Sequence, residues 1–374
     1  MKNIQTPTVE YRKGIYYLTL DGKTPYERGY QHGAALEFLI KKALRQFKAW
    51  IRQNVGLDDP EEMILDFAEN TPYLASVQAD VPDLYAEMQG IAEGACVDLK
   101  QLFVYQSFDE FFVFLLTSGA LEQGSTGHCT TAGIYGRPDK SNFVAHNNDI
   151  PTYHEELVTV LHIKFPDSDL EILQSTFAGG IGQNGVNNKG VAVGINTLAN
   201  LPGGGGLPVS FNLRKILESG NIAEAVAYLQ YARFAQAMNY MIGDRERVVS
   251  VETWESNALV LDIYDGNYAV HTNHSIGEGT PKTFEMTSEM GGGSYSFTME
   301  RLELGKELLA DTENISLESF QQVFKTRPIL VYPGKPTGRT LMQMTAEIPK
   351  DGYPVLHLTP DSPNLFKHVK FTFG

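Results

Sequence analysis

The sequence predicts an α+β fold in which two mainly antiparallel sheets are stacked on each other and flanked by helices. Helical patterns dominate the chain before Cys129, and several consecutive strand patterns, interrupted by pairs of helices, follow it. Runs of strands favour stacked antiparallel sheets, whereas a parallel sheet requires strict alternation of strands and helices. No stretch has the composition of a linker, so we expect residues 1–374 to form a single domain.

The first elements are a strand over residues 15–20 and a helix that begins at Pro25. Thr24 and Glu27 have the spacing of a capping box, in which each side chain binds the other residue's backbone N–H. Apolar residues keep helical spacing from this start to residue 51, which predicts one amphipathic helix facing a core. Gly29 and Gly33 lie four residues apart and predict close packing of its first turns.

Three further helical stretches precede the cysteine, over residues 60–70, 85–94 and 99–114. The last is strongly aromatic, which is typical of a core helix or of the wall of an apolar pocket. Asp109 and Glu110 interrupt it, and they are difficult to explain because a buried carboxylate is costly without partners.

The pattern after Cys129 changes to strands that are separated by Gly-, Asn- and Asp-rich turns. Strands are expected over residues 143–146, 158–163, 171–176, 190–196, 239–242, 248–253, 259–263, 268–272, 340–347 and 355–358. Helices are expected over residues 211–217, 222–231, 296–309 and 317–324.

Composition limits the classes of function. The 374 residues include 42% hydrophobic residues and carry a formal net charge of −15, so the chain can form a core but repels phosphate backbones. We therefore expect no nucleic-acid partner. No apolar stretch is long enough to cross a bilayer, and no signal-peptide pattern opens the chain, so we expect no membrane association and a cytoplasmic location. Two cysteines provide no disulfide framework.

Cys129 is our candidate nucleophile. A thiol attacks as its thiolate and needs a base, because an unperturbed cysteine has a pKa near 8.5. If Cys129 first attacks the carbonyl carbon of His128, the peptide becomes a thioester that water releases. The new α-amine of Cys129 then has a reference pKa of about 7.7 to 8, so it can accept the thiol proton near neutral pH. The small polar residues at 124–127 favour a loop that can be strained for this cut.

Side-chain amides near predicted strand ends are candidate donors to an oxyanion, notably Asn184 and Asn273. Asp149 could orient the α-amine or a neighbouring amide. His271 and His274 have the spacing His-x-x-His, but no cysteine or carboxylate ligand is placed near them, so we expect neither a metal nor another cofactor.

Alternatives remain open on the residues alone. His128 or His146 could pair with Cys129 in a conventional Cys-His hydrolase without chain cleavage. The chain could also be an uncleaved, catalytically impaired binding protein, because Cys-Thr-Thr is a common sequence and Asn-Gly pairs usually form turns.

Several motifs in order resemble one known family. They are residues 26–33 (YERGYQHG), 87–95 (EMQGIAEGA), 129–131 (CTT), 147–149 (NND), 181–194 (IGQNGVNNKGVAVG) and 272–274 (TNH). Together they resemble the acyl-CoA:6-aminopenicillanate acyltransferase family, also called the C45 peptidase family, of cysteine N-terminal nucleophile (Ntn) hydrolases. Their order and spacing are more specific than any single motif.

The resemblance implies a four-layer αββα Ntn-hydrolase sandwich whose precursor, a zymogen, cuts itself before Cys129. Residues 1–128 would form an N-terminal α chain and residues 129–374 a catalytic β chain. Cys129 would be the nucleophile, Asp149 would lie beside its α-amine and Asn273 would bind the oxyanion. The family also uses a late arginine, for which Arg339 is the nearest match.

Two departures from the family pattern affect these expectations. His128 stands where the family usually has glycine, and a histidine there would bear the steric cost of any left-handed conformation. Asn148 stands where the family tends to have an aromatic residue.

We therefore predict a cysteine amide hydrolase or acyltransferase that acts on a small N-acyl or acyl-thioester substrate through an S-acyl enzyme. Asn147, Asn184 and Tyr153 are expected to contact this substrate, and Cys129, Asp149, Asn273 and Arg339 to form the catalytic set. The expected partners are the substrate and the two fragments of the same chain, and a homo-oligomer is left open.

Overall fold

The structure of the chain is a computed structural model that describes residues 4–121, 128–137, 140–198, 203–261, 266–282, 292–332 and 338–374. For residues 128 and 292–295 only the backbone is described.

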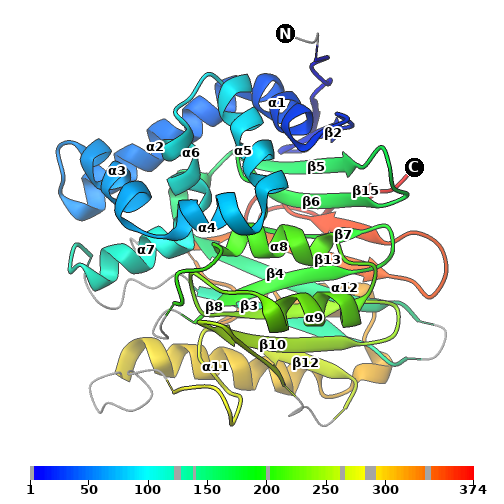
Figure 1. Cartoon of the computed structure of the whole chain (residues 1–374). Helices are drawn as coiled ribbons and strands as arrows, with labels where there is room; N and C mark the ends of the chain where they lie inside the picture. Colours follow the sequence, from blue (N-terminus) through cyan, green and yellow to red (C-terminus); the bar gives the residue numbers. More distant parts are fainter. Residues whose placement is uncertain are drawn as a thin grey trace.

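Two β-sheets form the centre of the molecule (Figure 1). Within the described residues, the larger sheet has nine strands in the order β1-β2-β5-β6-β7-β8-β9-β10-β11. These strands are β1 (Glu10–Arg12), β2 (Ile15–Leu20), β5 (Val158–Lys164), β6 (Glu171–Phe177), β7 (Asn184–Asn187), β8 (Ala192–Thr197), β9 (Met238–Gly243), β10 (Val248–Trp254) and β11 (Asn257–Leu261). Neighbouring strands are antiparallel except β2 and β5, which are parallel.

The second sheet is antiparallel throughout and has six strands in the order β12-β3-β4-β13-β14-β15 within the same residues. They are β3 (His128–Ile134), β4 (Asn142–Ile150), β12 (Tyr268–His271), β13 (Arg339–Ile348), β14 (Val355–Leu358) and β15 (Val369–Thr372). The sheets stack closely because small residues face larger ones. A Cβ atom added at Gly194 of β8, for example, would come within 2.9 Å of the His146 Cβ on β4.

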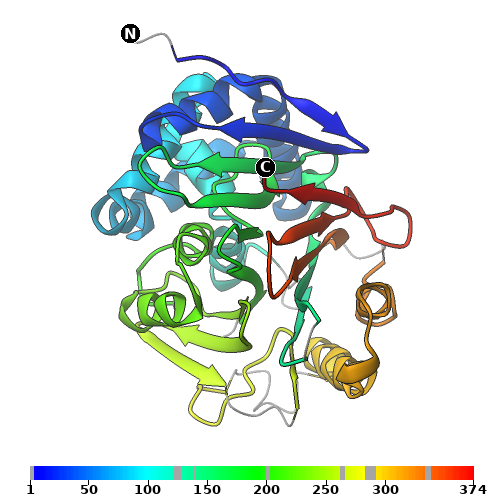
Figure 2. The same ribbon diagram turned by 90° about the vertical axis from the view of Figure 1, so that its right-hand side faces the viewer.

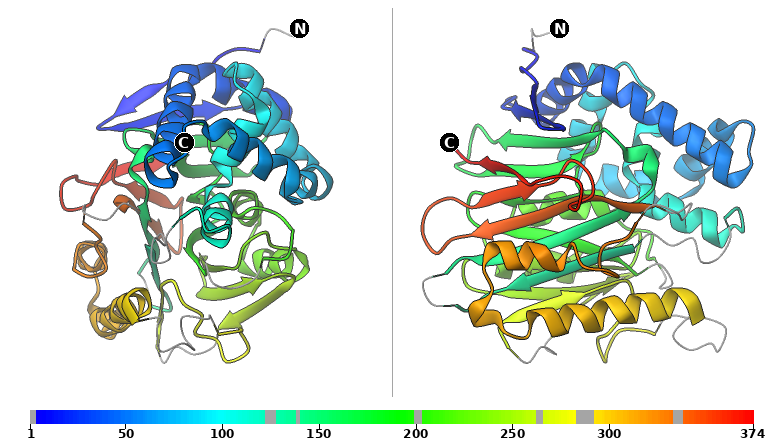
Figure 3. Two further views of the ribbon diagram at one scale, coloured as in Figure 1. Left: turned by 90° about the vertical axis from the view of Figure 1, so that its left-hand side faces the viewer. Right: turned by 180° about the vertical axis from the view of Figure 1, so that it is seen from behind.

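Helices cover the outer faces of both sheets, which gives four layers (Figure 2). α8 (Val209–Leu217) and α9 (Ile222–Tyr231) contact the nine-stranded sheet. α11 (Gly292–Leu309) contacts the six-stranded sheet, with α12 (Leu317–Val323) packed against α11 (Figure 3). This arrangement confirms the predicted αββα sandwich of two mainly antiparallel sheets.

The remaining helices gather at one end of the sandwich (Figure 1). They are α1 (Pro25–Ala35), α2 (Glu37–Val55), α3 (Pro60–Asn70), α4 (Tyr73–Asp80), α5 (Pro82–Gly94), α6 (Leu99–Gln106) and α7 (Phe108–Thr117). None of the helices in the described parts of the chain is long and apolar enough to span a membrane.

Glycines hold α1 against α5, as the spacing of Gly29 and Gly33 predicted. A Cβ at Gly29 would lie 1.8 Å from the carbonyl oxygen of Glu87, and one at Gly90 would lie 2.2 Å from that of Tyr26. The two backbones therefore touch directly, and neither helix can accept a side chain at these positions. The predicted capping box of Thr24 and Glu27 at the start of α1 is also present.

Several sequence expectations differ from the structure. The first long helix is broken at Leu36, and the aromatic helix is broken at Ser107, so each becomes two shorter helices. Cys96 is exposed, at a backbone φ of 51°. The strands β1, β3, β7 and β15 and the helix α4 were not predicted, since their short or polar sequences have no clear periodicity.

The glycine contacts between α1 and α5 lead to a test of stability. Gly90→Ala should reduce the free energy of unfolding by about 1 to 3 kcal/mol, because the added methyl group meets the backbone of α1. Urea unfolding measures this change. Gln78→Ala, at an exposed position of α4, is the control and should change stability by less than about 0.5 kcal/mol. Equal effects of the two substitutions would contradict the close contact.

Candidate active site

Cys129 is the second residue of β3 and pairs with Asn148 of β4. Paired residues point to the same face of a sheet, and here that face is the interior of the sandwich, since Gln183 Nε2 lies 3.1 Å from Asn148 Oδ1. The Cys129 side chain is buried with 7% of its surface exposed. The cysteine was not predicted to lie in a strand, and the strand fixes the direction of its thiol.

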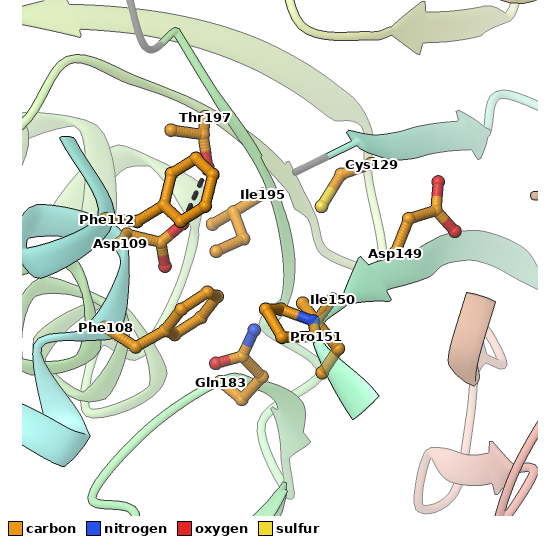
Figure 4. A pocket seen from close by; sticks show the side chains of 10 residues that line it. All are labelled: Phe108, Asp109, Phe112, Cys129, Asp149, Ile150, Pro151, Gln183, Ile195 and Thr197. Carbon is orange, nitrogen blue, oxygen red and sulfur yellow. Dashed lines mark hydrogen bonds between the residues drawn. The ribbon is translucent and has the colours of Figure 1, made fainter. Parts of the chain in front are cut away.

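The thiol borders a small cavity of about 20 Å³, which has room for about one water molecule (Figure 4). The walls come from α7, from the end of β4, from β8 and from the segment before β7. The lining residues are Phe108, Asp109, Phe112, Cys129, Asp149, Ile150, Pro151, Gln183, Ile195 and Thr197.

Asn273 binds the backbone nitrogen of Cys129. His271 of β12 pairs with Thr131, so Asn273 follows at the level of Cys129, just beyond the end of β12. Its Oδ1 accepts the Cys129 N–H at 2.8 Å, and its Nδ2 donates to the Thr197 carbonyl at 3.1 Å. A side-chain amide carries two N–H donors, so the second is available to an oxyanion.

Arg301 of α11 forms hydrogen bonds with Cys129, Thr130 and Asn273. It is not among the site residues predicted from the sequence. Its guanidinium is fully buried and donates to the Cys129 carbonyl at 2.6 Å, the Thr130 hydroxyl at 3.0 Å and Asn273 Oδ1 at 2.8 Å. Burial lowers the pKa of Arg301 to about 10, although Asp149 and Cys129 oppose the shift. The side chain is therefore a cation at neutral pH, fixed beside the cysteine. In the sequence it is one charged residue in a helical pattern, which carries no signal.

Asp149 lies on the opposite face of the six-stranded sheet from the Cys129 thiol. It pairs in register with Thr340, whose hydroxyl donates to Asp149 Oδ1, while Oδ2 has no partner among the described residues. Burial raises the pKa of Asp149 to about 7, although Arg301 and the Thr340 hydrogen bond lower it. Its backbone forms a hydrogen bond with the Cys129 thiol.

The thiol itself is held in its neutral form in the uncut chain. Burial is the main cause of the raised pKa of Cys129, and the charges of Asp149 and Asp109 raise it further. The Asp149 backbone and Arg301 act in the opposite direction without cancelling the effect. Cys129 therefore needs a base to attack any substrate.

The position of Asn273 depends on a buried hydrogen bond between Glu252 and His271. The carboxylate lies 2.9 Å from His271 Nε2 and also accepts the N–H groups of Ile276 at 2.6 Å and Gly277 at 3.2 Å. Burial alone would raise the pKa of Glu252, but these bonds and the charge of His271 lower it to about 2. The pair anchors the chain on both sides of Asn273.

Arg339, the expected late arginine, does not lie with Cys129. Its guanidinium forms ion pairs with Glu155 and Asp361, and no bond to Cys129, Asn273 or Asp149 is present in the described part of the chain. Arg339 is the first residue of β13 and pairs with Ile150 of β4, whereas Arg301 reaches the cysteine from the helix layer.

The three residues expected to contact substrate do not line the cavity. Asn147 points to the helix side of its sheet and donates to the carbonyls of Phe324 and Ile329, at 2.9 and 3.3 Å. Asn184 is bonded to Ser175 and His146. Tyr153 packs among buried rings, including that of Phe47 at 5.2 Å. All three belong to the scaffold in this structure.

No histidine in the described side chains pairs with Cys129. His146 faces the nine-stranded sheet, its Nδ1 lies 3.2 Å from Asn184 Nδ2, and burial lowers its pKa to about 3. The backbone of His128 is a strand position paired with Asp149, but its side chain and residues 124–127 lie outside the described residues. An extended strand does not require glycine, so the departure at His128 imposes no steric cost there.

The αββα sandwich and its buried cysteine, amide and arginine cluster define an enzyme of the Ntn-hydrolase fold that hydrolyses or transfers acyl groups at amides. The chain belongs to the acyl-coenzyme A:6-aminopenicillanic acid acyl-transferase family, whose sequence pattern matches residues 136–347. The matched region contains Asp149, Asn273 and Arg301 and starts just after Cys129.

One relative is the 40 kDa form of acyl-coenzyme A:6-aminopenicillanic-acid-acyltransferase from Emericella nidulans. It is 29% identical over 293 residues, which cover 77% of each chain. Among solved structures, a Caenorhabditis elegans ortholog of N-acylethanolamine-hydrolyzing acid amidase aligns with a TM-score of 0.45 and 15% identity, over 66% of this chain and 100% of that one. Penicillin V acylase from Agrobacterium tumefaciens aligns with a TM-score of 0.42 and 12% identity, over 66% and 86%.

The Glu252–His271 pair makes stability depend on pH. The folded pKa of Glu252, about 2, is below its ordinary value of 4.5, so the pair stabilises the fold fully above pH 4.5 and loses this effect as the pH falls toward 2. Glu252→Gln should lower the free energy of unfolding at pH 7 by about 3 kcal/mol. Urea unfolding at pH 7, 4.5 and 3 should show the difference from wild type shrinking at the lowest pH. A difference that is the same at all three values would rule out this linkage.

Proposed function

We propose that the chain cuts itself before Cys129 and then hydrolyses or transfers the acyl group of a small N-acyl or acyl-thioester substrate, with Cys129 as the nucleophile. The observation that carries this proposal is the contact between Asn273 and the Cys129 backbone nitrogen, with the thiol of the same residue at the cavity. The group that would become the α-amine is already held in the site by a fixed acceptor.

Chain cleavage would begin with attack of Cys129 Sγ on the carbonyl carbon of His128. The bond from that carbon to the Cys129 nitrogen breaks, the nitrogen takes up the thiol proton, and a thioester joins His128 to Sγ. Water then hydrolyses the thioester and leaves a carboxylate on His128. This step supplies the base that the buried thiol lacks, since a free α-amine has a reference pKa of about 7.7 to 8.

In the acyl-transfer cycle the α-amine removes the proton from Sγ as sulfur attacks the substrate carbonyl. The second N–H of Asn273 stabilises the oxyanion, and the leaving amine departs with the proton from the α-amine. Water or an acceptor amine then attacks the S-acyl enzyme and restores the thiol. Arg301 holds both the Asn273 amide and the Cys129 carbonyl, so we assign it a positioning role in place of the catalytic role expected of Arg339.

The relatives support the acyl chemistry but differ in what they act on. The Emericella nidulans protein is named for acyl transfer to 6-aminopenicillanic acid, and two solved structures are named for amide hydrolysis. We therefore propose an amide or thioester acyl donor and leave the acceptor open between water and an amine.

The intact mass of freshly purified protein under denaturing conditions tests self-cleavage. Wild type should yield two fragments, the larger beginning at Cys129, and Cys129→Ala should remain a single chain. The mature wild type should then release product from N-acyl amino acids, acylated β-lactams or acyl thioesters. An unsplit wild type that matches Cys129→Ala and has no activity would favour an uncleaved binding protein, and an active unsplit chain would favour a conventional Cys-His mechanism.

Arg301 and Arg339 provide a matched pair of variants. Arg301→Lys should reduce kcat/KM by about 100-fold or more, because the single nitrogen of a lysine cannot replace both Nη1 at the Cys129 carbonyl and Nη2 at Asn273 Oδ1. Arg339→Lys should change kcat/KM less than about threefold, since its ion pairs lie away from the thiol. Steady-state kinetics on the cleaved enzymes measures both. The reverse ranking would return the catalytic assignment to Arg339.

A further inference from the structure

Two acidic residues, Asp109 and Asp149, line the otherwise mainly apolar cavity beside Cys129, and the Asp149 carboxylate accepts the Thr340 hydroxyl on the other face of its sheet. Phe108 and Phe112 of α7 and Ile195 of β8 line the cavity together with Asp109, which reaches it from the same helix as the two rings (Figure 4). Asp109 is close enough to the thiol for its charge to raise the pKa of Cys129. The nucleophile and this carboxylate therefore border the same small space.

Only one of the two carboxylate oxygens of Asp109 has a hydrogen-bond donor among the described residues. The residue is buried, with 8% of its surface exposed. Oδ1 accepts a hydrogen bond from the Thr197 hydroxyl at 2.8 Å, while the buried Oδ2 has no donor among the described residues. Burial raises the pKa of Asp109, and the Thr197 bond opposes this. A buried carboxylate oxygen without a donor costs free energy, and a ligand that brings a donor would recover it.

The next residue shows that burial alone does not explain the placement of Asp109. Glu110 is also buried on α7, and its Oε1 accepts the backbone N–H of Val209 at 2.8 Å. Its Oε2 also lacks a donor among the described residues, but Glu110 does not line the cavity. The two carboxylates thus differ in one respect that matters for a ligand: only Asp109 borders the space in front of Cys129.

We propose that Asp109 binds a protonated amine on the acyl part of the substrate, so that the preferred substrates are amides or thioesters of amino-substituted acyl groups with a small apolar body. This assignment rests on the proposed function, because it places the acyl carbonyl at Cys129 Sγ. The acyl group then extends toward α7. Because the cavity holds only about one water molecule in this structure, the rings of Phe108 and Phe112 have to move apart to contact its apolar part, while Asp109 Oδ2 accepts from its ammonium group. Ionic hydrogen bonds of this kind are stronger than neutral ones.

Matched substrates separate the charge of the acyl group from its size. L- and D-alanyl p-nitroanilide are compared with propanoyl p-nitroanilide, and L- and D-phenylglycyl p-nitroanilide with phenylacetyl p-nitroanilide. Within each set the neutral compound differs from either amino enantiomer by the amino group alone. With the cleaved wild-type enzyme, the better amino enantiomer of at least one set should exceed its neutral analogue by about 10- to 100-fold in kcat/KM.

Variants assign this preference to Asp109. Asp109→Asn keeps the shape and an acceptor for Thr197 but removes the charge, so the ratio of amino to neutral substrate should fall to about one. Asp109→Ser is the second variant in case the first is not processed. Glu110→Gln is the matched control on the same helix and should retain the wild-type ratio. The ratio is an internal measure, so a general loss of folded enzyme does not change it.

Each outcome decides the proposal. Intact mass shows whether the substrates acylate Cys129 of the wild-type enzyme. If they do, but the enzyme favours the neutral compound or shows no preference in both sets, the role of Asp109 is overturned while the proposed function stands. A preference that survives in both Asp109 variants, or is lost in Glu110→Gln, also overturns it. If none of the compounds acylates the cleaved enzyme, the proposed function fails for these acyl groups and the assignment of Asp109 fails with it.

Discussion

The buried guanidinium of Arg301 is the contact on which the rest of the site depends. It joins α11 to the first residues of β3 and to the segment that follows β12, through the Cys129 carbonyl, the Thr130 hydroxyl and Asn273 Oδ1. A buried cation is tolerated only when it is bonded, and here its acceptors are the groups that define the position of the cysteine. The hydrogen bonds that this buried charge requires thus fix the geometry of Cys129.

The αββα sandwich places the two sides of this site on different layers. The Cys129 thiol faces the interior between the sheets, whereas Asp149 and Arg301 act from the helix side of the six-stranded sheet. Because side chains alternate along a strand, the side chains of a cysteine and its neighbours point to opposite faces of the sheet. The environment at one face holds the backbone nitrogen and carbonyl of Cys129, and the environment at the other contains the cavity beside its thiol.

A second consequence of the fold is that the N-terminal helices contribute to the cavity beside Cys129. α7 supplies Phe108, Asp109 and Phe112, although it precedes the proposed cleavage point in the sequence. The two fragments of a cleaved chain would thus share one site. The glycine contacts between α1 and α5 and the aromatic contacts of Phe67 with Phe103 and Phe111 unite these helices into one packed unit.

Features that depend on residues close together in the chain could be predicted from the sequence. The capping box of Thr24 and Glu27, the close approach at Gly29 and Gly33 and the runs of strands that imply stacked sheets all follow from short-range spacing, and the structure has them. The resemblance also placed Cys129, Asp149 and Asn273 in one site, and the structure brings them into the same cluster. Their catalytic roles remain predictions.

Only the tertiary structure decided which arginine reaches the cysteine and which residues form the cavity. Arg301 and Arg339 look alike in the sequence, and their roles differ because α11 crosses the start of β3 while Arg339 lies among Glu155 and Asp361. Asp109 could be recognised as costly but not as a neighbour of Cys129, since the two lie on elements that meet only through packing. Contacts between distant segments depend on how whole layers fit together, and local periodicity carries no information about that fit.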